Sequence, residues 1–196
     1  TNWTPKRLWN NNIFRSASIL AALGLAGYVS GSPLNTISSA TAGTVHILSF
    51  ATWFGTMFYT TFIFGITAFK NLPRQTFGRL QSKLFPKYFN LCAISIVLQL
   101  ITRKSMPFLA SKKVTAALGT ALAMTLLNLF YLEPKSTKIM FERYELEGQP
   151  EGKESDKYKE LASAFGKFHG ISSLTNLIAL CGAVAHGFYI ASGLVA

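Results

Sequence analysis

Two of the three histidines in this chain are candidate metal ligands. His46 begins one long apolar run, and His186 lies near the far end of another. If both runs cross a membrane, the two imidazoles lie towards the same side, where they can approach each other with Met57 as a further soft ligand. Two histidines alone do not make a metal site. We therefore expect no metal and no cofactor, and keep His46 and His186 as the candidate ligands.

A second group of polar residues lies at the opposite end of the apolar runs. His169 begins the last run and is followed by Ser172 and Asn176, while Glu133 closes the preceding run. Polar side chains inside a membrane are costly unless they bond to one another. We expect Glu133, His169, Ser172 and Asn176 to form a polar network, of which a proton or ion relay is a more specific version. A carboxylate at that depth also needs a base, and the candidates are Arg74, Arg79 and Lys83.

Enzyme motifs are absent from the sequence. It contains no GxSxG, no Walker loop and no HExxH. All eight acidic residues lie between Glu133 and Glu160, so the first 132 residues offer no carboxylate for acid–base catalysis. We expect no catalytic residue and no enzymatic activity.

Long apolar runs must position these polar residues. The chain is 49% hydrophobic and 14% charged, against about 25% charged residues in an ordinary soluble domain. Runs of 17–25 mainly apolar residues are typical of membrane-spanning helices. The sequence therefore predicts an all-α membrane protein, with a domain over 43–196 whose four spans cover about 43–69, 84–102, 114–132 and 171–194.

An extension of residues 1–42 precedes this domain. Its apolar stretch, about residues 13–30, predicts one extra helix that is just long enough to span. Spanning the membrane and lying in its interface remain alternatives for this helix.

A basic hinge over residues 70–88 joins the first two spans of the domain. Read as a helix, Arg79, Lys83 and Lys87 recur every four residues beside an apolar stripe, a pattern that suits the boundary between lipid tails and anionic headgroups. A basic loop that only fixes topology is the alternative. We favour a short interfacial helix that leads into the next span and contacts headgroups through Arg74, Arg79, Lys83 and Lys87.

Charge also predicts the orientation of the spans. Residues 133–170 hold every acid and seven basic residues, and the Gly- and Pro-containing stretch 148–152 predicts a helical hairpin outside the membrane. The hinge and this hairpin lie on one side, which carries more lysine and arginine than the other. The positive-inside rule places that side in the cytosol, or in the matrix of an organelle.

Three sequence blocks carry a family resemblance. The first block runs from Val45-His46 through Thr61-Phe62 and Gly65 to Leu72-Pro73-Arg74, Thr76-Phe77-Gly78 and the stretch 81–89. The second block is Asn128 with Leu132-Glu133-Pro134. The third is Phe165 with His169-Gly170 and the stretch 172–177. Over about residues 43–195 the chain resembles the transmembrane protein 205 family, whose domain has no known function. The resemblance implies a four-span helical domain and brings no catalytic residues.

The function expected from these observations is architectural. We expect a non-enzymatic, multi-pass membrane protein with a role in membrane organisation, trafficking or small-solute movement. The alternative is an accessory subunit of a larger membrane complex, such as an organellar energy-transducing one. The expected partners are the lipid bilayer, its anionic headgroups, and other membrane proteins or a second copy, and we expect no nucleic acid. Endomembrane and mitochondrial locations are both open.

Overall fold

The computed structural model describes residues 38–195, which form helices and contain no strand. The helix expected over 13–30 lies outside the described residues. Four helical stretches are long and apolar enough to cross a membrane, namely Ser39–Asn71, Arg74–Ser105, Lys112–Glu147 and Asp156–Gly193. The predicted all-α membrane protein is thus confirmed.

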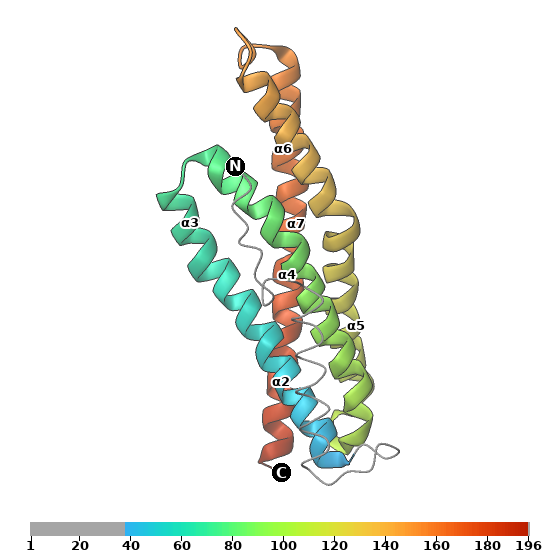
Figure 1. Ribbon diagram of the computed structural model, residues 1–196. Coiled ribbons are helices and arrows are strands. Elements are labelled where there is room, and N and C mark those ends of the chain that lie inside the picture. The colour runs from blue at the N-terminus through green and yellow to red at the C-terminus, as the bar shows by residue number, and fades with distance from the viewer. Residues whose placement is uncertain (1–37, 196) are drawn as a thin grey trace.

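The four stretches run alternately up and down a bundle (Figure 1). The first is α2 (Ser39–Phe58), continued by α3 (Gly65–Asn71), and the second is α4 (Arg74–Thr102). The third joins α5 (Lys112–Leu127) to α6 (Glu133–Glu147), and the last is α7 (Asp156–Leu194). Helix α2 packs mainly on α4, and α5 mainly on α7.

Two stretches contain a π-helical segment in mid-course. The segment η2 (Tyr59–Phe64) joins α2 to α3, and η5 (Asn128–Leu132) joins α5 to α6. Both are continuous with the helices beside them, since the residues that flank them keep helical backbone angles. Wide turns of this kind are frequent at functional sites.

Most of the hinge is continuous with the second span, and the interfacial position that we favoured for it stays a prediction. The break is confined to Leu72 and Pro73, whose backbones are extended, because a residue that precedes proline is disfavoured in the helical region. From Arg74 the hinge residues are the first turns of α4, which continues through Pro86. Proline is tolerated within a membrane helix because neighbouring groups satisfy the freed carbonyl.

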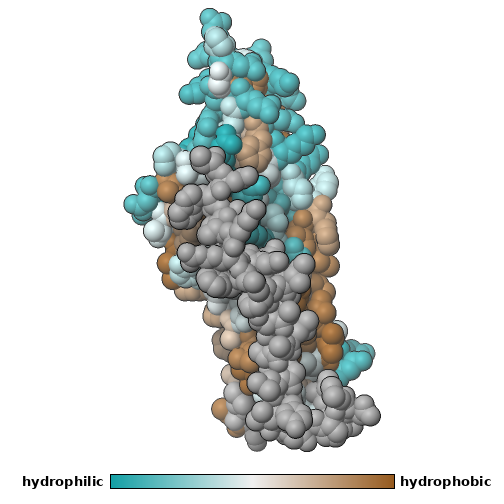
Figure 2. All heavy atoms as spheres, viewed as in Figure 1, coloured by the Kyte–Doolittle hydropathy of each residue, from teal (hydrophilic) through white to brown (hydrophobic). Residues whose placement is uncertain are grey.

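The hinge and the charged hairpin lie at the same end of the bundle, which we call the head (Figure 1). Helices α6 and α7 extend beyond the other helices and meet in a turn over 148–155. Hydrophilic residues gather over this end, and hydrophobic residues predominate lower down (Figure 2). At the opposite end, the base, the short 3₁₀ turns Arg103–Ser105 and Pro107–Leu109 connect α4 to α5.

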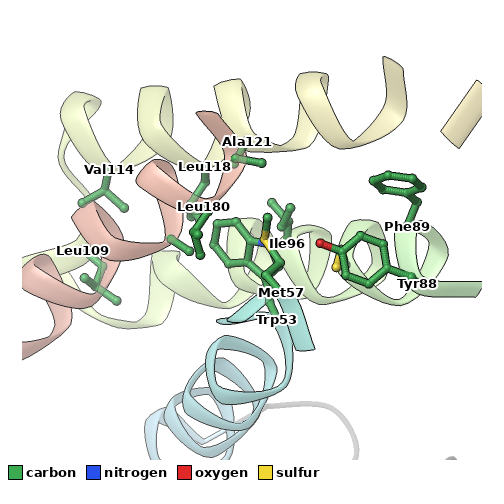
Figure 3. Close-up of a cluster of buried hydrophobic side chains, with 13 residues drawn as sticks. Trp53, Met57, Tyr88, Phe89, Ile96, Leu109, Val114, Leu118, Ala121 and Leu180 are labelled. Carbon is green, nitrogen blue, oxygen red and sulfur yellow. The ribbon is translucent and has the colours of Figure 1, made fainter. Parts of the chain in front are cut away.

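The core lies between the head and the base. Trp53 and Met57 of α2 are fully buried and lie among Ile96 of α4 and Leu180 of α7 (Figure 3). Outward-facing positions carry large apolar side chains such as Phe130, which is 74% exposed. An apolar exterior around a packed interior is the arrangement that a lipid environment favours.

Candidate functional site

The two π-helical segments present polar groups to the interior near the head. In η2, the Gly65 N–H bonds to the carbonyl of Thr60, five residues back, and Thr61 lies beside it in the same wide turn. In η5, the Glu133 N–H bonds to the carbonyl of Asn128 in the same way. Each segment therefore turns one polar stretch of an otherwise apolar helix towards the other helices.

A cavity of about 200 Å³ lies near the head, between η2, α4, α6 and α7. Gly78 of α4 helps to shape it, since a Cβ at this position would lie 2.2 Å from Tyr144 Oη and 2.6 Å from Met140 Sδ. A glycine there allows α6 to pack closely against α4. The lining residues are mostly hydroxyl, amide and aromatic: Thr60, Thr61, Gly65, Gly78, Gln81, Ser82, Phe85, Tyr88, Phe89, Glu133, Ser136, Thr137, Met140, Phe165, His169, Ser172, Ser173 and Asn176.

All four residues of the expected polar network line this cavity, but they bond in separate groups. Asn176 accepts a hydrogen bond from Tyr88 Oη at 2.8 Å and donates to Thr61 Oγ1 at 3.4 Å. Ser172 donates to Asn128 Oδ1 at 2.5 Å. The His169 ring stacks on that of Phe165, with centroids 5.4 Å apart. The cavity, and not a continuous chain of hydrogen bonds, is what brings these side chains together.

Glu133 lies at the cavity without the basic partner that we expected. It is 7% exposed, and Thr137 Oγ1 donates to its carboxylate at 2.7 Å. Within residues 38–195 it forms no ion pair, and Arg74 pairs with Glu147 instead. The reason is position, because Arg74 begins α4 beside the far end of α6, about 21 Å along the helix from Glu133.

The other basic residues of the hinge do not reach the carboxylate either. The Arg79 guanidinium lies over the rings of Phe141 and Tyr144, at 5.7 and 5.9 Å from their centroids. Lys83 and Lys87 are both exposed. Headgroup contact through Arg74, Arg79, Lys83 and Lys87 stays a prediction.

The two candidate metal ligands do meet at the base of the bundle. His46 and His186 are fully buried, and their Nε2 atoms lie 2.8 Å apart, a hydrogen-bond distance. Met57 lies eleven residues further along the chain from His46, or about 16 Å away along the helix. Within residues 38–195, no three His, Cys, Asp or Glu side chains form a group that could hold a metal ion. The geometry describes a hydrogen-bonded pair.

The direction of each hydrogen bond in this pair follows from its neighbours. Thr102 Oγ1 donates to the Leu98 carbonyl at 2.7 Å, so it accepts from His46 Nδ1 at 2.9 Å. A neutral His46 then accepts at Nε2 from the N–H of His186. This assignment leaves His186 Nδ1 as a buried acceptor, without a partner among the residues that the structure describes.

Removing either histidine should lower the free energy of unfolding by more than the loss of one hydrogen bond alone. We expect His46→Leu and His186→Leu each to lower the free energy of unfolding by about 1–2 kcal/mol, because each leaves the other imidazole buried with a lost partner. The double variant should cost less than the sum, with a coupling energy of about 0.6–1.7 kcal/mol. Denaturant unfolding of the full chain in micelles, followed by circular dichroism, measures all three. Strictly additive losses would contradict the hydrogen-bonded pair.

Sequence reasoning missed several lining residues. Thr60, Thr61, Ser136 and Thr137 line the cavity. Thr60 and Thr61 lie in an apolar span, whereas Ser136 and Thr137 lie in a charged segment. The available signal was spacing, because Glu133 and Ser136 are three residues apart and face the same side of a helix.

A comparison with known protein families identifies the family of this chain. The model of a domain of unknown function, DUF4149, matches residues 48–145, which is half of the chain. The chain belongs to the DUF4149 family. The matched region of this DUF4149 protein includes the cavity residues of η2, α4 and α6, while those of α7 lie beyond it.

A curated relative extends the similarity. Transmembrane protein 205 of Danio rerio is 27% identical to this DUF4149 protein over 173 residues, which cover 76% of this chain and 92% of the zebrafish protein. The resemblance stated from the sequence is thereby confirmed. No solved structure matches the chain.

Proposed function

We propose that this DUF4149 protein is a non-enzymatic, multi-pass membrane protein that binds a small polar group in the head cavity, in support of membrane organisation, trafficking or small-solute movement. The observation that carries the proposal is the head cavity, where hydroxyl and amide groups lie beside the buried Glu133 carboxylate. Ser136 Oγ is buried there and has no partner among residues 38–195. Buried polar groups without partners cost free energy, which a bound polar ligand would offset.

The position of the cavity supports the same proposal. It lies at the level of the hinge, where the lysines of α4 are close to the boundary between lipid and water. A polar group of a solute or of a lipid reaches such a depth without crossing the apolar interior. We further propose that the head faces the cytosol or an organellar matrix, following the excess of basic residues in the hinge.

The experiment compares probes of different chemistry on the full chain in micelles. Ethanolamine, choline and glycerol are added as free solutes and as headgroups of short-chain phosphatidyl lipids, and thermal unfolding is followed. We expect at least one probe to raise the unfolding temperature saturably, as binding to the folded state requires. Ser136→Leu, which fills part of the cavity, should abolish that rise, while Lys138→Leu on the exposed face of α6 should retain it. Absence of any saturable rise, or its survival in Ser136→Leu, would contradict the proposal.

The projecting α6–α7 hairpin supports a second candidate function, that of an accessory subunit in a larger membrane complex. A hairpin that extends beyond the other helices offers a surface for another protein (Figure 1). Native gel migration after mild detergent extraction tests this candidate. A large assembly of fixed composition would support it, and migration as a monomer or small oligomer would exclude it.

A further inference from the structure

We infer that the ligand of the head cavity carries a primary ammonium group, from a free amine or an ethanolamine headgroup, with Glu133 as its counter-charge. This inference rests on the proposed function, because it names the ligand class of the same cavity. It is carried by the charge, the hydrogen-bonding groups, the aromatic rings and the size of the cavity.

Charge is the first argument. Among the described residues that line the cavity, Glu133 is the one acid and none is lysine or arginine. A carboxylate that is 7% exposed is costly without a positive partner. The polar side chain that donates to it, Thr137, is neutral. A cation in the cavity would supply the missing charge.

The basic residues nearby are occupied elsewhere. Arg74 binds Glu147, and the Lys135 ammonium lies 4.8 Å from the centre of the Phe168 ring. The Arg143 guanidinium lies between Tyr158 and Phe165, at 5.2 and 5.5 Å from their centroids. These three bases therefore contact an acid or aromatic rings, and none of them pairs with Glu133.

The hydrogen-bond acceptors of the cavity distinguish a primary ammonium ion from a quaternary one. Ser136 Oγ is buried, lines the cavity and has no partner in the described residues. It lies one turn from Glu133 on the same face of α6, so the hydroxyl and the carboxylate can accept from one donor group. A primary ammonium has three N–H donors, whereas a quaternary ammonium such as choline has none. The acceptors therefore favour the primary amine.

The aromatic rings and the size of the cavity agree with this choice. Phe85, Tyr88, Phe89 and Phe165 line the cavity, and the face of an aromatic ring attracts a cation. A volume of about 200 Å³ is below the roughly 300–1,000 Å³ of pockets for drug-sized ligands. It suits a group the size of ethanolamine.

The test measures affinities of the full chain in micelles for the six probes named above, by titration with thermal-shift readout. We expect free ethanolamine or phosphatidylethanolamine to bind at least about tenfold more tightly than the glycerol and choline counterparts, since hydrogen bonds between charged groups are stronger than those between neutral groups. Glu133→Gln should remove that preference. Glu142→Gln, a change to an acid that pairs with Lys138 on the same helix, should keep it.

The outcomes separate the two proposals. Preference for the free amine identifies a soluble ligand and preference for the lipid identifies a headgroup, and both support the inference. Equal affinity for glycerol, choline and ethanolamine overturns the ammonium inference and leaves the proposed binding function standing. Failure of every probe to bind overturns both. The comparison among probes needs only the natural chain, so it decides the question even if Glu133→Gln does not fold.

Discussion

Replacing Glu147 with alanine is expected to lower the free energy of unfolding by about 2–3 kcal/mol. The Glu147 side chain is 4% exposed and accepts hydrogen bonds from Arg74, from Gln75 at 2.8 Å and from Tyr158 at 2.9 Å. These donors belong to the start of α4 and the start of α7. One carboxylate thus joins three helices at the head, and its loss leaves three donors without their acceptor.

The control for this prediction lies two residues away. Glu145 is exposed, so Glu145→Ala should change the free energy of unfolding by less than about 0.5 kcal/mol. Denaturant unfolding of the full chain in micelles measures both variants. The Arg74 side chain is 51% exposed, so solvent screens its share, and Arg74→Ala should cost less than Glu147→Ala. Equal small effects for Glu145 and Glu147 would show that the carboxylate does not hold the helices together.

Trp53→Ala is expected to have the largest effect on stability, about 3 kcal/mol. The indole is fully buried at the centre of the core, between helices α2, α4 and α7 (Figure 3). Helices in lipid associate chiefly by close packing. The loss therefore comes from the cavity that remains, since each Å³ of cavity costs roughly 24 cal/mol in a folded interior.

Phe188 provides the matched comparison for Trp53. It is a large aromatic residue on a spanning helix, but it is 71% exposed on the outer face. Phe188→Ala should therefore leave the midpoint of unfolding nearly unchanged in the same assay. A similar loss for both variants would mean that burial in the bundle does not distinguish them. Benzene or xenon, which fill apolar cavities, should restore part of the stability of Trp53→Ala alone.

The sequence predicted the features that depend on composition along one helix. The apolar runs between charged segments located the four spans, and the basic residues near Pro73 located the turn between the first two. The meeting of His46 and His186 was also predictable, because alternating spans place the start of one run beside the end of another.

Features that depend on how helices face one another were not predictable. The π-helical segments leave no mark in composition, because residues 59–64 and 128–132 are as apolar as their neighbours apart from a few polar side chains. The pairing of Arg74 with Glu147 and not with Glu133 depends on where α4 begins relative to the end of α6. The cavity depends on both, so sequence reasoning named four of its residues without finding the cavity itself.

The length of α7 has a consequence for what can approach the head. Its 39 residues extend over about 58 Å at 1.5 Å per residue, whereas a bilayer with its headgroups is about 40–45 Å thick. With the base of the bundle at one surface, the hairpin turn stands about 15 Å beyond the other, further than the screening length of about 8 Å in physiological salt. In that placement we expect the hairpin to act as a spacer, which keeps a second membrane or a large complex at a distance from the head cavity.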